Sequence, residues 1–113
     1  MNQINNYLKE QFPEMINLTK ELINIDSQSD DVPGVQKVAD VLSQKMSELG
    51  MTTRQIDQGK PGTVLIGELA GDPGLKPVIL LGHMDTVFPR GTVEKHPFKI
   101  EDDKMMGPGI FDM

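Results

Sequence analysis

Apolar residues recur every three or four positions in the first half of the chain and predict two amphipathic helices. The first apolar stripe spans residues 4–25, and Pro13 predicts that this helix is kinked or restarts there. The second helix follows Asp31, a residue type that often caps helix N-termini, and its apolar face spans residues 35–49. Gly50 then fits the position just past the C-terminus, where a positive φ favours glycine.

The pattern changes after the second helix and predicts strands. Residues 52–56 and 63–69 are expected to form two strands joined by a turn at residues 59–62. Residues 78–81 are a continuous apolar run, which is typical of a central strand buried on both faces. Residues 98–106 predict a hairpin with a polar tip. These elements together predict an α/β fold in which both helices pack on a mixed, largely parallel sheet.

Length, charge and composition restrict the class of protein. A chain of 113 residues has room for one domain at most, and no linker divides it, so residues 1–113 are expected to form one unit without an internal boundary. The net charge of -6, without a basic cluster, argues against nucleic-acid binding. The longest apolar run is too short to span a bilayer and the N-terminus is too polar for a signal peptide, so a cytoplasmic protein without a membrane partner is expected.

The sequence contains no cysteine, so any metal site must use histidine and carboxylate side chains. His83 and Asp85 directly follow the predicted central strand, and their spacing of two places both side chains on the same side of an extended backbone. A neutral histidine can bind a metal through one ring nitrogen while a carboxylate fixes the other. The alternative is a histidine that is hydrogen-bonded within a loop, and the three-residue pattern alone leaves both open.

Further acidic and histidine residues lie downstream. Asp112 follows a turn of two glycines and a proline at residues 107–109 that could deliver its carboxylate rigidly, and the alternative is a surface aspartate near a frayed terminus. His96 lies in a predicted loop and is a weaker candidate for a metal ligand. Residues 101–103 are acidic but lack the alternating oxygen ligands of a calcium loop, so a solvated hairpin tip is expected.

Several spaced elements of the sequence together resemble the dinuclear zinc exopeptidase and deacylase family, which includes glutamate carboxypeptidase, aminoacylase, acetylornithine deacetylase and succinyl-diaminopimelate desuccinylase. The matching stretches are residues 80–88, 91–93, 97–98 and 107–113, and the two helix ends at residues 22–27 and 48–51. The order His-Met-Asp-Thr-Val, then Gly-Thr-Val, then Pro-Phe is most similar to the glutamate carboxypeptidase branch. The resemblance implies the N-terminal part of a zinc-exopeptidase catalytic domain.

The resemblance also implies roles for single residues. His83 matches a zinc ligand, Asp85 matches the catalytic carboxylate that orients it, and Asp112 matches the carboxylate that bridges two zinc ions. Co²⁺ or Mn²⁺ is expected to be able to substitute for Zn²⁺. The peptide bond between Asp112 and Met113 is expected to be cis. In this family a zinc-bridging water, deprotonated by a glutamate, attacks the amide carbonyl of the substrate.

The sequence stops before the Lys-Gly-Gly helix start of the family, and the later ligands, the general base and a dimerisation domain have no counterpart in it. We therefore expect residues 1–113 to be the N-terminal half of a metallopeptidase catalytic domain, inactive and at best a weak zinc binder by itself. The full-length protein is expected to be a homodimer that hydrolyses a small peptide. The alternatives are an N-acyl amino acid deacylase of the same family and a non-catalytic fragment or pseudoenzyme.

Overall fold

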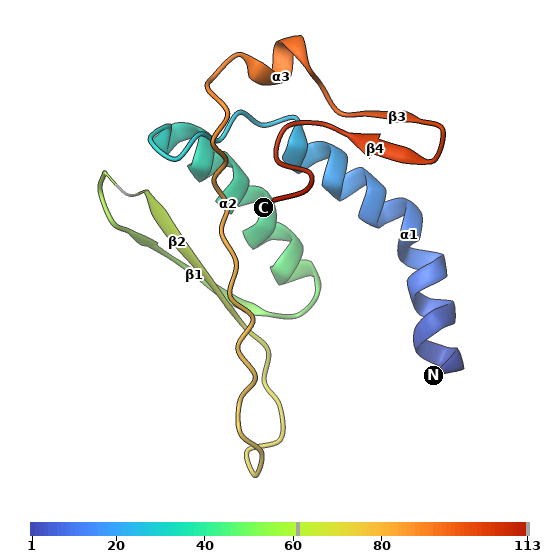
Figure 1. Ribbon diagram of the computed structural model, residues 1–113. Helices are drawn as coiled ribbons and strands as arrows, with labels where there is room; N and C mark the ends of the chain where they lie inside the picture. Colours follow the sequence, from blue (N-terminus) through green and yellow to red (C-terminus); the bar gives the residue numbers. More distant parts are fainter. Residues whose placement is uncertain (61, 113) are drawn as a thin grey trace.

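The computed structural model describes residues 1–60 and 62–112, and in them three helices and two small sheets make up the fold (Figure 1). The helices are α1 (Asn2–Ile23), α2 (Val32–Glu48) and α3 (Thr92–Lys95). The strands are β1 (Thr52–Asp57), β2 (Thr63–Glu68), β3 (Lys99–Glu101) and β4 (Lys104–Met106). Strand β1 pairs antiparallel with β2, and β3 pairs antiparallel with β4. The chain thus combines helices and sheets, as the α/β prediction requires.

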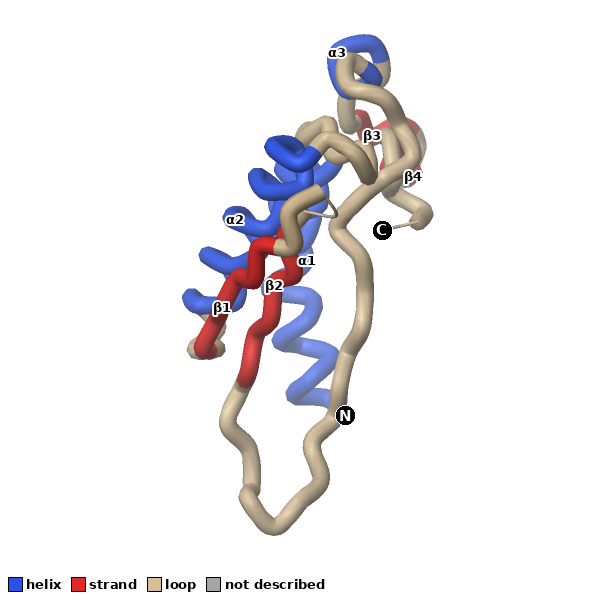
Figure 2. Tube along the Cα trace, turned by 90° about the vertical axis from the view of Figure 1, so that its left-hand side faces the viewer, coloured by secondary structure: helices blue, strands red, loops and turns tan. Residues whose placement is uncertain are grey.

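Helix α2 and the β1–β2 hairpin form the main packing unit, and both were predicted. The Asp31 side chain caps α2 by accepting a hydrogen bond from the Gly34 N–H at 3.1 Å. Gly50 follows the helix with a φ of 84°. The hairpin lies against one side of α2 (Figure 2). The buried residues of α2 are Gly34, Val35, Val38 and Ala39. The apolar stripe of α2 therefore supplies most of the small core of the described residues.

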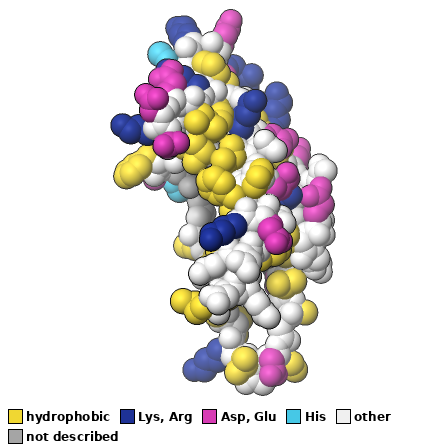
Figure 3. Space-filling model, turned by 90° about the vertical axis from the view of Figure 1, so that its right-hand side faces the viewer, with side chains coloured by type: hydrophobic (Ala, Val, Ile, Leu, Met, Phe, Trp, Pro, Cys, Tyr) yellow, Lys and Arg dark blue, Asp and Glu magenta, His cyan; other side chains and the backbone are white. Residues whose placement is uncertain are grey.

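Helix α1 continues through Pro13 instead of restarting there, and Figure 1 shows its axis changing direction near the middle. Proline lacks the N–H of an interior helix bond, which accounts for a bend at that point. The expectation that both helices pack on the sheet is wrong for α1. Ile23 is its buried residue, whereas Ile4 and Phe12 are 62% and 57% exposed, and hydrophobic side chains gather on this side of the molecule (Figure 3). Helix α2 already covers a face of the two-stranded β1–β2 sheet, so that face is not available to α1.

The described residues contain no helix that is both long and apolar enough to cross a membrane. Helix α1 has the length, with 22 residues, but its mean hydropathy is low because polar and charged residues alternate with its apolar stripe.

The prediction of a buried central strand at residues 78–81 is wrong. Their side chains are between 82% and 95% exposed, and they lie in the long arm that leaves β2 and returns toward α3 (Figure 2). A groove of about 420 Å³ separates the returning arm from β2. An apolar run predicts burial only where neighbouring strands can pair with both of its edges, and in the described part of the chain β2 pairs with β1. The sheets described are therefore antiparallel and not mixed or largely parallel.

The second hairpin, β3–β4, was predicted and has an acidic tip as expected. Asp102 and Asp103 have φ angles of 46° and 63°, which a two-residue turn of type I′ requires at both central positions. Glu101 pairs with Lys104 across the turn. The short helix α3 precedes this hairpin and was not predicted.

Candidate metal centre

Residues 24–31 link α1 to α2 and are called the connector. Hydrogen bonds join the connector to the loop at residues 85–93. The Thr86 N–H donates to the Ser27 carbonyl at 2.8 Å, and the Ser29 N–H donates to the Thr86 carbonyl at 3.1 Å. These bonds form an isolated parallel bridge between two segments that are far apart in the sequence. They fix the backbone directly after the candidate ligand His83.

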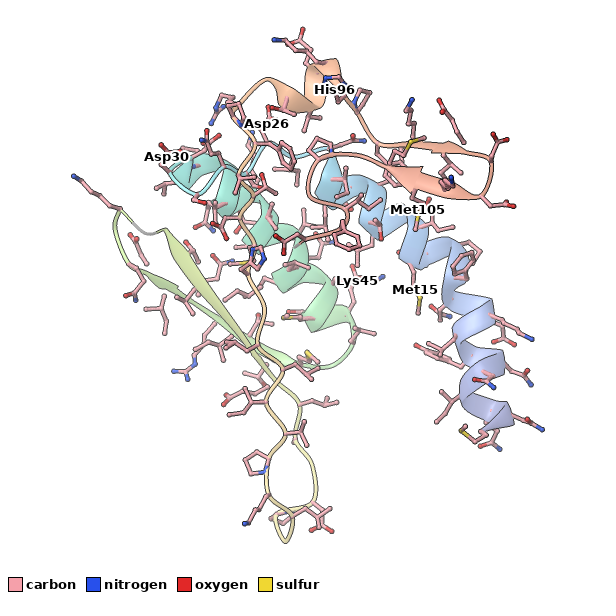
Figure 4. All side chains as sticks on the ribbon, viewed as in Figure 1. Met15, Asp26, Asp30, Lys45, His96 and Met105 are labelled. Carbon is pink, nitrogen blue, oxygen red and sulfur yellow. The ribbon has the colours of Figure 1, made fainter. Side chains whose placement is uncertain are left out.

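Two connector carboxylates extend this contact. The Asp26 carboxylate accepts hydrogen bonds from the Gly91 and Val93 N–H groups at 2.7 and 3.1 Å, at the start of α3, and Figure 4 shows Asp26 facing this part of the chain. The Asp31 carboxylate accepts a hydrogen bond from Arg90 at 2.5 Å. Asp31 was predicted as the cap of α2, and no role was predicted for Asp26. No pattern among neighbouring residues indicates that these aspartates bind residues so far away in the sequence.

The ion pair between Asp31 and Arg90 predicts a pH-dependent contribution to stability. The hydrogen bond from Arg90 lowers the pKa of the Asp31 carboxyl below its ordinary value of 3.8. The ionised carboxylate therefore stabilises the fold above pH 3.8, and this contribution is lost as the pH falls through the lowered pKa. Asp31→Asn keeps a side chain that can cap α2 but removes the charge. We expect the variant to be less stable than wild type at pH 7, because the charged partner of Arg90 is lost. The loss should be small, because Arg90 is 63% exposed and water screens the pair.

Urea unfolding of wild type and Asp31→Asn at several pH values measures this difference. The two unfolding free energies should converge as the pH falls below 3.8 and through the lowered pKa of Asp31, where the wild-type carboxyl takes up a proton. A difference that does not shrink as the pH falls through this range would assign the effect to the cap and not to the ion pair.

His83 lies between two carboxylates. Its Nδ1 is 2.9 Å from the Asp85 carbonyl oxygen and 3.1 Å from Asp85 Oδ1. Both partners are acceptors, so Nδ1 carries the ring proton and Nε2 keeps its lone pair when the ring is neutral. Nε2 lies 3.5 Å from Asp112 Oδ1. The Asp85 carbonyl, followed by the Asp85 and Asp112 carboxylates, raises the pKa of His83 above its ordinary value.

Asp85 is held from its other side by the connector. The Ser29 hydroxyl donates to Asp85 Oδ2 at 2.5 Å. This hydrogen bond, more than the one from His83, lowers the pKa of the Asp85 carboxyl. Asp85 therefore remains a carboxylate acceptor for the His83 ring at neutral pH. Sequence reasoning missed Ser29, since a serine in a polar connector is typical of an ordinary turn.

Asp112 reaches the site through a tight turn. Its N–H donates to the Gly109 carbonyl at 3.1 Å, and Gly109 has a φ of 79°. A Cβ atom at Gly109 would lie 2.8 Å from the Thr86 side chain, so only glycine permits this approach. The Asp112 side chain is 91% exposed. The Asp112–Met113 peptide bond, expected to be cis from the resemblance, lies outside the described residues.

The three predicted site residues thus line one cavity of about 280 Å³. Its lining consists of His83, Asp85, Thr86, Val87, Phe88, Gly107, Gly109, Ile110, Phe111 and Asp112. Two ligands of a tetrahedral zinc ion lie about 3.4 Å apart, which fits the 3.5 Å between His83 Nε2 and Asp112 Oδ1. No cluster of three or more acidic or histidine ligands is present within residues 1–60 and 62–112. The donor set fits part of a zinc site.

The remaining candidates lie elsewhere. His96 lines a separate cavity of about 390 Å³, and Figure 4 shows it beside α3. The acidic residues 101–103 lie at the exposed tip of the β3–β4 hairpin. Neither contributes a ligand to the cavity that contains His83.

Comparison with known proteins gives the relationship of this chain. No family model matches the sequence. The chain is 36% identical over 102 residues to carboxypeptidase G2 from Pseudomonas sp. (strain RS-16). The match covers 88% of this chain and 24% of that protein, so most of the relative has no counterpart in these residues. This similarity, which includes the stretch around His83 and Asp85, relates the chain to the glutamate carboxypeptidase family.

Proposed function

We propose that the protein containing this chain is a zinc-dependent hydrolase that cleaves a peptide bond at the C-terminus of its substrate. The similarity to a carboxypeptidase supports a peptidase. One structural observation carries the proposal: His83 Nδ1 is bound by Asp85, while Nε2 faces Asp112 Oδ1 at 3.5 Å. A ring nitrogen and a carboxylate directed at the same point are what two ligands of one metal ion require.

Each side chain has a defined part in this proposal. His83 would hold zinc through Nε2, and Asp112 would hold it through its carboxylate. Asp85 would keep the ring proton on Nδ1, so that Nε2 stays available. Zinc, when bound, lowers the pKa of a coordinated water and polarises a substrate carbonyl. Co²⁺ or Mn²⁺ would accept the same nitrogen and oxygen ligands.

We also propose that residues 1–113 are the N-terminal half of the catalytic domain of a longer, cytoplasmic enzyme that forms a homodimer. The further zinc ligands and the general base would then come from residues outside this chain. The 24% coverage of the relative supports a longer protein. The groove beside β2 and the exposed apolar residues 78–81 support a larger, mixed sheet, since apolar segments of this kind are normally covered.

A zinc titration of the 113-residue chain, followed by NMR of the His83 ring, tests the metal site. We expect binding at His83 with a dissociation constant weaker than about 1 µM, because a catalytic zinc normally has about three protein ligands and two converge here. Asp85→Asn should weaken this binding by about 10- to 100-fold, because the orienting carboxylate is lost. Asp102→Asn, at the exposed hairpin tip, is the control and should bind zinc like wild type.

Equal zinc affinity in Asp85→Asn and wild type would contradict the orienting role of Asp85. In the full-length protein, release of the last residue from a C-terminal glutamyl peptide is the expected activity. Hydrolysis of N-acetyl or N-succinyl amino acids alone would instead make the protein a deacylase.

A further inference from the structure

We propose that Ser29 is a positioning residue that acts on His83 through Asp85. The inference rests on the proposed metal site, since the orientation that Ser29 would maintain is the one in which His83 offers Nε2 to a metal. Ser29 lies in the connector and is separated from Asp85 by 56 positions in the sequence, yet its hydroxyl donates to Asp85 Oδ2 at 2.5 Å. No other connector side chain among the described residues is hydrogen-bonded to Asp85 or His83.

The two oxygens of Asp85 serve different partners. Oδ1 lies 3.1 Å from His83 Nδ1, and Oδ2 accepts the hydrogen bond from Ser29. The terminal torsion of an aspartate has a broad energy minimum, so a contact with His83 alone would leave the carboxylate free to turn. The Ser29 hydroxyl restricts that rotation and keeps Oδ1 opposite Nδ1. Together with the Asp85 carbonyl oxygen, which lies 2.9 Å from Nδ1, this carboxylate keeps the proton on Nδ1, and Nε2 remains directed at Asp112.

The backbone holds the Ser29 hydroxyl in place. The Ser29 N–H donates to the Thr86 carbonyl at 3.1 Å, and the Thr86 N–H donates to the Ser27 carbonyl at 2.8 Å. Thr86 is 9% exposed and Ser27 is 1% exposed, so water has little access to the bond between these two residues, while Ser29 itself is exposed. Because Asp85 directly precedes Thr86, the same two bonds set the distance between Ser29 and Asp85.

Ser27 provides a matched control on the same segment. Its Oγ is buried and has no hydrogen-bond partner among the described residues. Ser27→Ala removes the same atom as Ser29→Ala, two positions away, without touching Asp85. If the connector only braces the fold, the two substitutions should affect His83 alike. If Ser29 positions the His83 ring, Ser29→Ala should affect His83 and Ser27→Ala should not.

The experiment compares Ser29→Ala, Ser29→Thr and Ser27→Ala with the wild-type chain. NMR of the ring nitrogens, in the metal-free chain at a pH where His83 is neutral, shows which nitrogen carries the proton. We expect Ser29→Ala to lower the share of the Nδ1-protonated form, because the Asp85 carbonyl oxygen is then the remaining fixed acceptor of that proton, and to weaken zinc binding by about 3- to 10-fold. Ser29→Thr keeps the hydroxyl and should restore both properties, and Ser27→Ala should alter neither.

Two results would overturn the proposal: a wild-type proton distribution in Ser29→Ala, or an equal change in Ser27→Ala. Circular dichroism checks that each variant folds. If Ser29→Ala does not fold, Ser29→Cys keeps the volume and weakens the hydrogen bond, and it gives the same comparison. If zinc does not bind at His83 in wild type, the proposed function fails. The proton distribution in the metal-free chain then still decides the role of Ser29.

Discussion

Replacing His83 by alanine is expected to lower the zinc affinity of the chain by at least about 100-fold, to the limit of detection. The imidazole Nε2 is the nitrogen ligand of the proposed site. The sequence has no cysteine that could replace it. Asp112 alone, with its side chain 91% exposed, would be a weak ligand held by a single short turn. Isothermal titration calorimetry or NMR titration with Zn²⁺ at neutral pH measures the loss.

His96→Ala is the matched control, because His96 is the second of the two histidines in the sequence. It lines a different cavity, so its removal should leave the zinc affinity unchanged. A larger loss of binding in His96→Ala than in His83→Ala would remove His83 from the site. Equal binding in all three chains would show that zinc binds elsewhere, for example at surface carboxylates.

Gly34→Ala is expected to destabilise the chain by about 3 kcal/mol. A Cβ atom at this position would lie 2.1 Å from the Asp26 carbonyl oxygen and 3.0 Å from Asp31 Cγ. In an exposed helix the same substitution would stabilise by about 1 kcal/mol, because alanine has the higher helix propensity. Steric overlap with a backbone atom outweighs that gain, since the connector must shift away from α2. Urea unfolding followed by circular dichroism measures the change.

Gly71→Ala is the control for this substitution. Gly71 is exposed, and nothing lies within 4 Å of the position that its Cβ would occupy. The free energy of unfolding of Gly71→Ala should therefore stay within about 0.5 kcal/mol of wild type. A Gly34→Ala variant as stable as Gly71→Ala would mean that the connector can retreat from α2 at little cost.

Elements that are specified by neighbouring residues could be predicted from the sequence. Helix α2 has its cap at Asp31, and Gly50 adopts the positive φ expected just past its end. Both hairpins were predicted from strand-like segments separated by turn residues, including the polar tip at residues 101–103. In each case the bonds that define the element join residues close in the sequence, so the local pattern carries the whole signal.

Elements that depend on distant partners could not be predicted in the same way. The apolar run at residues 78–81 indicates that burial is favourable, but it does not specify which strand would lie beside it. The structure leaves this run exposed next to a groove. The stripe of α1 is a similar case: its spacing predicted the helix correctly, while its burial depended on a sheet face that α2 occupies.

The candidate site was predicted in part. The two-residue spacing of His83 and Asp85 placed them together, and the glycine turn before Asp112 suggested a rigid approach, while the resemblance supplied their roles. Ser29 was missed, because its partner lies 56 positions away. Asp26 was missed for the same reason.

These long separations in the sequence also decide when the site can form during folding. Ser29 and Asp85 are 56 positions apart, and Asp26 and Val93 are 67 apart. Closing a flexible loop of that length costs roughly 3–4 kcal/mol of chain entropy, whereas the hairpins close loops of only a few residues. The helices and hairpins can therefore appear early, while the connector meets the loop that follows His83 only in the last stage. The connector and the loop are joined by hydrogen bonds between segments that lie outside α1 and α2, so a local opening can separate them without unfolding either helix. The chain would then lose metal binding while its helices are still intact.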